Sequence, residues 1–223
     1  ADFEKCPFIV SVGGQIPNTL SRKIVKTGNK IMGTTADSID QAEDREKFSR
    51  LLDKLDIRQP IWKRLRSDKE AIRFAQKIGY PILVRPSYVL SGKAMFVAYS
   101  EEQFLLSLNQ AGVTINTEYP MVISKFIRGA KEIDFDAVAQ NGKIITYAIS
   151  EHIEHSGVHS GDASLVLPTF SLCDNAINQI KSVSQKIAGK LKINGPFNVQ
   201  YLVDENERRL PEIMVIEANL RAS

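Results

Sequence analysis

The pattern of apolar and polar residues changes along the chain and divides it into three parts. The first part follows the order strand, helix, strand: an apolar run at Phe8–Val12, a Gly-Gly turn, a helix over Asn18–Lys26 and an extended segment at Lys30–Gly33. This order within about 30 residues predicts a βαβ unit with parallel strands. We expect Phe8–Val12 to be a buried strand and residues 1–36 to be the end of an α/β domain.

Helical spacing dominates the middle part. Apolar residues over Ala42–Leu55 recur at intervals typical of a single amphipathic helix. Two serines each stand three residues before Glu or Gln, and this capping box predicts a helix start. The pairs are Ser67 with Glu70 and Ser100 with Gln103, which open helices ending near Ile78 and Asn109. Strands are expected between these helices, at Ile82–Arg85 and Ala94–Tyr99.

The last part is rich in predicted strands. One long helix, Asp174–Lys192, interrupts them, and Asn141-Gly142 between two runs of strand character is a strong signal for a hairpin turn. The expected strands are Met121–Phe126, Glu132–Ala139, Lys143–Ser150, Leu165–Leu167, Asn198–Val203 and Glu212–Asn219. The fold class indicated is therefore α+β, with a small α+β unit followed by a unit built on a sheet.

Composition narrows the class of protein. The chain has 223 residues, and its 29 Lys and Arg against 26 Asp and Glu give a net charge of +3 without a basic run, which speaks against nucleic-acid binding. Hydrophobic residues at 43% and charged residues at 25% are typical of globular proteins and exclude disorder. No apolar run approaches the ~18 residues of a membrane span. Cys6 and Cys173 are far apart, which favours a reduced, intracellular compartment.

An arginine at the end of an apolar strand is the first candidate for chemistry. Arg85 is followed by a loop rich in Ser and Gly that contains Lys93. A guanidinium and backbone N–H groups in such a loop can hold phosphate oxygens. The alternative is that Arg85 caps a surface strand that leads into a plain hairpin.

Acidic residues and histidines gather in the next segment. Glu132, Asp134 and Asp136 alternate with apolar residues and should share one strand face, which by itself is most simply a solvated face. The three histidines, at 152, 155 and 159, have a spacing that would suit zinc on a helix. Neighbouring glycines argue against a helix there and favour a loop for a polar ligand or an alkali ion.

Three oxygen donors form the sharpest candidate site. Glu217 and Asn219 are two residues apart on a predicted strand, so their side chains project from the same face. Gln200, on the strand expected beside it, offers a third oxygen. Three such donors suit Mg²⁺, which takes its other ligands from water and substrate phosphates. The alternative is an ion pair between Glu217 and Arg221.

Four segments taken together resemble the carbamoyl-phosphate synthetase family. They are Arg85-Pro-Ser-Tyr-Val-Leu-Ser-Gly92, Ser150-Glu-His-Ile-Glu154, Gly157-Val-His-Ser-Gly-Asp162 and Ile216-Glu-Ala-Asn-Leu-Arg-Ala-Ser223. The resemblance runs nearly end to end. It is to the second, C-terminal ATP-grasp half of the large subunit, in its eukaryotic form.

This resemblance implies an ATP-grasp fold over residues 37–223, truncated at its C-terminus, with ATP between two α+β subdomains and with residues 1–36 as the end of a pre-ATP-grasp α/β domain. It implies phosphorylation of carbamate by ATP to carbamoyl phosphate. The implied cofactors are ATP, Mg²⁺ or Mn²⁺, and K⁺. The implied partners are carbamate and the rest of the synthetase chain, including the first ATP-grasp half and an ammonia or glutamine source, with neither nucleic acid nor membrane.

The resemblance also assigns roles to single residues. Arg85, Glu217 and Asn219 match catalytic positions, and Gln200, Glu217 and Asn219 match the ligands of the divalent metal. The ATP-binding positions are Arg45, Arg85, Lys125, Ile127, Glu132, Gly157, Val158, His159, Ser160, Gln200 and Glu217. The potassium positions are Glu132, His152, Glu154 and Val158.

Two other functions stay open. A first ATP-grasp half, or another ATP-grasp ligase, would phosphorylate bicarbonate or a different acid. A fragment of the synthetase, which the cut character of both chain ends suggests, would bind nucleotide without turnover of its own. The pathway (pyrimidine, arginine or urea synthesis) stays open too, as does the choice between cytoplasm and mitochondrion.

Overall fold

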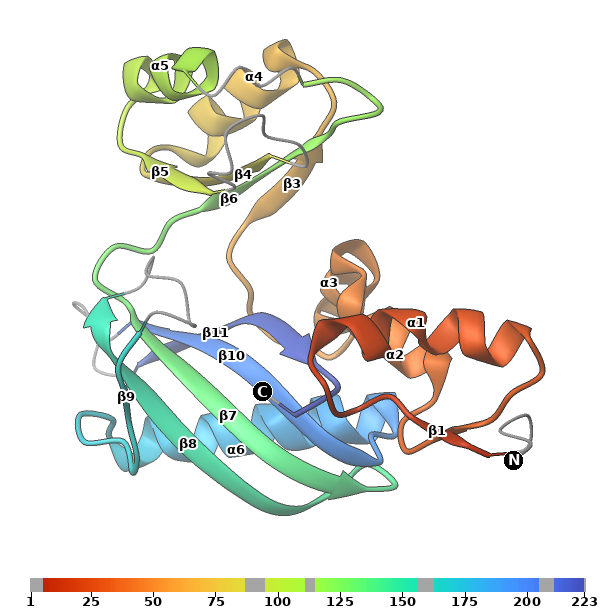
Figure 1. The fold of residues 1–223 in the computed structure, drawn as a ribbon. Helices are drawn as coiled ribbons and strands as arrows, with labels where there is room; N and C mark the ends of the chain where they lie inside the picture. The colour runs from red at the N-terminus through yellow and green to blue at the C-terminus, as the bar shows by residue number, and fades with distance from the viewer. Residues whose placement is uncertain (1–5, 87–94, 111–114, 156–162, 205–210, 223) are drawn as a thin grey trace. The chain divides into compact units, whose positions relative to one another are not determined.

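The computed structural model describes residues 6–86, 95–110, 115–155, 163–204 and 211–222. The chain forms two compact units (Figure 1). Unit 1 contains residues 1–59 and 129–223, and unit 2 is the continuous segment Pro60–Arg128 between them. The architecture is mixed helix and sheet in both units, which confirms the predicted α+β class.

Unit 1 is built on an antiparallel sheet of five strands. The strands are β7 (Lys131–Gln140), β8 (Lys143–His155), β9 (Leu165–Val166), β10 (Gly195–Asp204) and β11 (Glu212–Asn219). Their order in the sheet is β11–β10–β7–β8–β9. The turn between β7 and β8 is the predicted hairpin, in which Asn141 and Gly142 have φ values of 50° and 80°.

One face of this sheet is covered by α6 (Asp174–Leu191) (Figure 1). The helix presents Ile180 and Ile187 to the sheet, where they pack in the core with alternate residues of β7 and β10. Phe135, Phe197 and Tyr201 are the largest of these buried residues. Because side chains alternate along a strand, the residues of β7 and β10 that alternate with these buried ones project from the opposite face of the sheet.

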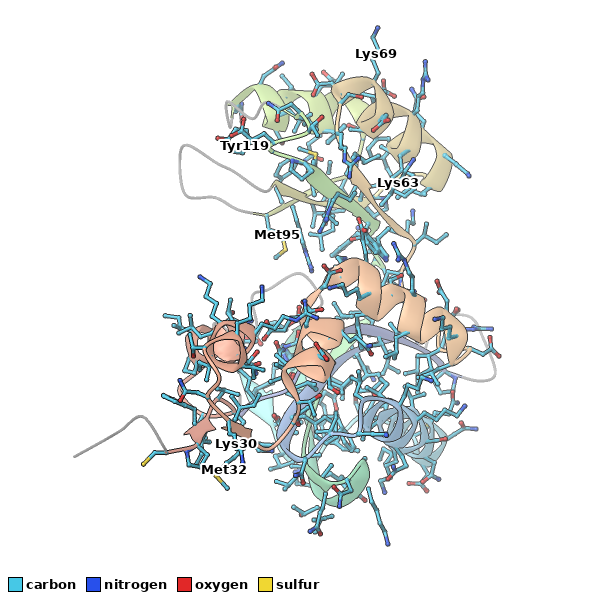
Figure 2. The ribbon with its side chains drawn as sticks, turned by 90° about the vertical axis from the view of Figure 1, so that its right-hand side faces the viewer. Lys30, Met32, Lys63, Lys69, Met95 and Tyr119 are labelled. Atoms are coloured by element: carbon cyan, nitrogen blue, oxygen red, sulfur yellow. The ribbon has the colours of Figure 1, made fainter. Side chains whose placement is uncertain are left out.

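The first residues of unit 1 form the expected parallel βαβ unit. Its elements are β1 (Phe8–Ile9), α1 (Gln15–Lys26) and β2 (Ile31–Met32), and β1 pairs with β2 in parallel. The expectation of a buried first strand is wrong, because Phe8 is 41% exposed and Ile9 is 59% exposed. Met32 on β2 is exposed as well, and its side chain is labelled in Figure 2.

The single helix expected over Ala42–Leu55 is two helices. α2 (Ala36–Glu43) ends at Asp44, and α3 (Arg45–Lys54) begins directly after it. Asp44 has an extended ψ of 110°, and its carboxylate accepts hydrogen bonds from the backbone N–H groups of Glu46 and Lys47, both at 3.0 Å. An acceptor in this N-cap position starts a new helix, which explains the break.

Unit 2 has four strands and two helices. The strands are β3 (Trp62–Leu65), β4 (Ile82–Pro86), β5 (Phe96–Ala98) and β6 (Met121–Lys125), in the antiparallel order β3–β6–β4–β5. The helices α4 (Asp68–Ile78) and α5 (Glu101–Gln110) pack on this sheet through Ala71, Ala75, Phe104 and Leu108. Strand β3 was not expected from the sequence. Lys63 on β3 and Lys69 on α4 are exposed (Figure 2).

No helix among the described residues has the length and apolar content needed to cross a membrane.

Candidate functional site

The polar side chains of interest lie on the face of the unit 1 sheet that is opposite α6. Phe135, Val199 and Ala218 face the core on three neighbouring strands. The polar residues next to them along each strand therefore point the other way. These are Glu132, Asp134 and Asp136 on β7, Asn198 and Gln200 on β10, and Glu217 and Asn219 on β11.

The three predicted metal ligands are brought together. Gln200 stands directly opposite Glu217 in the β10–β11 register, which confirms that these strands are neighbours. A bulge after Gln200 shifts the register there. The Asn219 Nδ2 donates to Glu217 Oε1 at 3.1 Å, and all three residues are half-buried. Arg221 donates to Gln15 Oε1 at 3.1 Å and to the Ala222 carbonyl at 3.0 Å, rather than to Glu217.

Asp134 is the centre of a buried hydrogen-bond network on the same face. Its Oδ2 lies 2.7 Å from His152 Nε2, and its Oδ1 accepts from Asn198 Nδ2 at 3.0 Å. The same Asn198 nitrogen donates to Asp136 Oδ1 at 3.1 Å. Asp134 is only 6% exposed, so the interpretation of this strand face as a solvated one is wrong for its central carboxylate.

The residues expected to hold potassium have partners of their own. His152 and His155 lie in β8, so a helix carrying the three histidines is excluded. His152 contacts Asp134, and Glu154 Oε2 accepts from the Ser164 backbone N–H at 2.8 Å. Hydrogen bonds from Ser164 and from its own backbone lower the pKa of Glu154 below its usual value.

A second buried carboxylate, Glu151, was missed by the sequence analysis. It is 2% exposed and accepts hydrogen bonds from the backbone N–H groups of Phe170 and Ser171 at 3.2 and 3.1 Å, and from the Ser171 hydroxyl. Its place one residue before His152 puts it on the other face of the sheet. Glu151 thus anchors the segment after β9 and is not part of the candidate site.

In unit 2 the predicted nucleotide residues lie on two paired strands. Arg85 is at the end of β4, opposite Val122 of β6, and its Nε is buried without a hydrogen-bond partner among the described residues. Lys125 ends β6, and its Nζ donates to the carbonyls of Gly79 and Tyr80, both at 3.0 Å. Burial lowers the pKa of Lys125. Ile127 follows in the same segment and is half-buried.

The remaining predicted residues are placed as follows. Arg45 is the first residue of α3 in unit 1 and is half-buried. Glu132 lies near the start of β7 and is also half-buried. Gly157, Val158, His159 and Ser160 lie outside the described residues.

A divalent metal fits the donor set of β10 and β11. Across the described part of the chain, no three His, Cys, Asp or Glu side chains form a group suited to hold a metal ion. The candidate set instead combines one carboxylate, Glu217, with the amide oxygens of Gln200 and Asn219. Hard oxygen donors of this kind, too few to enclose an ion, suit Mg²⁺ shared with substrate phosphates.

Comparison with known sequences gives relatives over nearly the whole chain. The sequence profile described as "Carbamoyl-phosphate synthase L chain, ATP binding domain" matches residues 44–223. Carbamoyl-phosphate synthase [ammonia], mitochondrial, of Aquarana catesbeiana is 52% identical over 215 residues, which are 96% of this chain and 14% of that protein. The arginine-specific large chain of Schizosaccharomyces pombe, also mitochondrial by name, is 48% identical over 96% of this chain and 19% of its own. The chain thus spans less than a fifth of either relative.

Solved structures support the fold. The biotin carboxylase domain of Hydrogenobacter thermophilus 2-oxoglutarate carboxylase, in complex with MgADP, ADP and bicarbonate, has a TM-score of 0.72 at 18% identity, over 92% of this chain and 46% of that one. The ADP complex of an N5-carboxyaminoimidazole ribonucleotide synthetase has a TM-score of 0.71 at 11% identity, over 92% of this chain and 51% of that one. Both are ATP-grasp enzymes, so the predicted α+β ATP-grasp fold is confirmed.

Proposed function

The chain belongs to the carbamoyl-phosphate synthase family, as an ATP-binding domain of the large chain, and on this premise we propose that it binds MgATP and phosphorylates carbamate to carbamoyl phosphate. The observation that carries the proposal is the juxtaposition of Gln200, Glu217 and Asn219 on two paired strands. The presence of these oxygen donors on one sheet face of an ATP-grasp chain supports a metal–nucleotide site there.

Gln200, Glu217 and Asn219 would hold Mg²⁺ or Mn²⁺ in this proposal. An ion held by these residues would supply positive charge against the negative charge that develops on the phosphates during transfer. The hydrogen bond from Asn219 to Glu217 holds the carboxylate in one orientation before the ion arrives. No general base is needed, because carbamate is already an anion.

The nucleotide contacts are proposed residue by residue. Arg45 and Arg85 would meet phosphate oxygens, and the buried Nε of Arg85, without a partner among the described residues, is the strongest support. Lys125 and Ile127 would meet the base, and Glu132 would accept hydrogen bonds from the ribose. Gly157, Val158, His159 and Ser160, outside the described residues, are proposed as further nucleotide contacts.

Potassium is the second ion of the proposal. Glu132, His152, Glu154 and Val158 are its proposed ligands. Glu154 has an ionised carboxylate at neutral pH, as its lowered pKa requires, but one of its oxygens already accepts from Ser164. The remaining acceptor sites of Glu132 and Glu154 would have to supply most of the coordination.

The decisive experiment uses the full-length synthase and measures ATP formation from carbamoyl phosphate and ADP. This reverse reaction reports the carbamate-phosphorylating half, whereas bicarbonate-dependent ATP hydrolysis reports the other half. We expect Glu217→Gln to reduce the rate of the reverse reaction by about 100-fold or more, because the negative charge that develops during phosphoryl transfer would lose the stabilisation by the metal ion.

The matched control is Glu212→Gln on the same strand. Glu212 pairs with Arg58 at 2.8 Å, away from the metal ligands, so the reverse reaction should keep most of its rate. A loss of bicarbonate-dependent hydrolysis in Glu217→Gln, with the reverse reaction intact, would assign this domain to the first half-reaction instead.

A further inference from the structure

Three buried polar residues of unit 1 stand next to the proposed metal ligands without being among them. Asp134, His152 and Asn198 are 6%, 4% and 2% exposed. We infer that Asp134 is a positioning residue of the metal site, which it serves through Asn198. The inference rests on the proposed function, because it assigns a role within the same site.

Asp134 connects three strands through its two carboxylate oxygens. Oδ2 lies 2.7 Å from His152 Nε2 on β8, and Oδ1 accepts at 3.0 Å from Asn198 Nδ2 on β10. A carboxylate only accepts hydrogen bonds, so the proton between Asp134 and His152 sits on Nε2 of the imidazole. Hydrogen bonds to an ionised acceptor are about twice as strong as neutral ones.

The orientation of Asn198 follows from these contacts. Its Nδ2 donates to both Asp134 and Asp136, at 3.0 and 3.1 Å. Because both amide protons are directed at β7, the carbonyl oxygen of Asn198 is turned away from β7. In the β10–β11 register, the residue of β11 directly opposite Asn198 is Asn219.

A continuous row of polar residues therefore crosses the sheet. It runs from His152 on β8 through Asp134 on β7 and Asn198 on β10 to Asn219 on β11, in the order of the strands. Asn219 is a proposed ligand and orients Glu217 by its own hydrogen bond. Asp134 thus holds Asn198, the residue of the row that stands opposite the proposed ligand Asn219.

Stability alone gives no reason for a carboxylate in this position. Burial of a charged group is costly, and its partners at most offset that cost. The apolar core of unit 1 lies on the other face, with Phe135 and Val199 next to Asp134 and Asn198. Groups that orient metal ligands are worth roughly 10- to 100-fold in metal affinity or activity, which is a sufficient reason for a buried network here.

The test is Asp134→Asn in the full-length synthase, with the Mg²⁺ or Mn²⁺ concentration for half-maximal reverse reaction as the readout. The variant is expected to fold, because the introduced amide can still accept from Asn198 and can donate to His152 in the other tautomer. We expect the half-maximal metal concentration to rise about tenfold, with kcat at saturating metal close to the wild-type value. The ¹⁵N NMR signals of His152 should show the proton moved from Nε2 to Nδ1.

Asp136→Asn is the matched control. It removes the same charge from the same strand face, keeps an acceptor for Asn198 and does not involve His152. A smaller rise in the metal requirement than in Asp134→Asn supports positioning. Equal rises in both variants would mean that charge acts through space, and no rise in Asp134→Asn would mean a structural role; either result overturns the inference.

Failure of the proposed function itself is recognised separately. A wild-type enzyme without metal-dependent reverse reaction, or one whose reverse reaction survives Glu217→Gln, contradicts the site as a whole. Loss of the reverse reaction in Glu217→Gln with an unchanged metal requirement in Asp134→Asn contradicts only the role of Asp134.

Discussion

Replacement of Gly142 by alanine should destabilise unit 1 more than its turn position alone explains. Gly142 has φ +80°, and a Cβ there would lie 2.9 Å from the Ala188 carbonyl oxygen and 2.9 Å from the Gly189 Cα. Both are backbone atoms of α6, so no side chain can rotate away to make room. The hairpin itself must move. That movement breaks two hydrogen bonds of Gly142, from its N–H to Ile193 O and from Gln185 Nε2 to its carbonyl, each 2.8 Å long.

The expected loss is about 3 kcal/mol. The left-handed conformation costs an alanine about 1 kcal/mol, and each lost hydrogen bond costs about 1 kcal/mol. Gly28→Ala is the matched control, because Gly28 has φ +83° but no atom within 4 Å of its Cβ position. It should lose only about 1 kcal/mol, the conformational part.

Urea denaturation followed by circular dichroism measures both variants. The difference in free energy of unfolding between Gly142→Ala and Gly28→Ala should be about 2 kcal/mol, which is the contribution of the close approach to α6. Equal destabilisation of the two variants would refute the reasoning, since it would show that the hairpin adapts to a Cβ at no cost.

Two further predictions concern buried polar groups. Tyr201→Phe removes a hydroxyl 2.6 Å from Ser184 Oγ in a fully buried position, and we expect a loss of about 1–2 kcal/mol in urea denaturation, part of which Ser184→Ala should recover in the double variant. Burial raises the pKa of Glu43 above its ordinary 4.5, so the native state binds its proton more tightly than the unfolded state does. This contribution to stability is complete below pH 4.5 and is lost as the pH rises through the native pKa. Glu43→Gln should flatten the dependence of Tm on pH in that range and raise Tm at neutral pH, and an unchanged pH profile would contradict the cause given.

Local chemistry accounts for the parts of the fold that the sequence predicts well. The capping boxes are real: Glu70 N–H donates to Ser67 Oγ at 3.3 Å, and Gln103 N–H donates to Ser100 Oγ at 3.2 Å. These interactions lie within four residues and need no tertiary context. By contrast, β3 carries two charged residues in its four and is a strand because it pairs with β6, about 60 residues later.

The same distinction between local and long-range interactions applies to the candidate site. The common face of Glu217 and Asn219 follows from the period of a strand, and the position of Gln200 opposite Glu217 was predicted from an expected pairing that the register confirms. The contact between Asp134 and His152 could not be predicted, because it joins residues 18 apart on two strands whose register is shifted by a bulge between Lys131 and Ile133. The spacing of Asn198 and Gln200, two residues apart like Glu217 and Asn219, was the available signal for the polar row.

The insertion of unit 2 into unit 1 has a consequence for the order of folding. All strands of unit 2 lie within Pro60–Arg128, and β3 and β6 near its two ends pair with each other. Unit 1 needs contacts such as that between Asn18 and the Leu220 carbonyl, 202 residues apart. Short loops close faster than long ones. During synthesis, unit 2 therefore completes its sheet while residues 1–59 still lack their contacts with β10 and β11. Residues 1–59, although made before unit 2, are therefore buried after it.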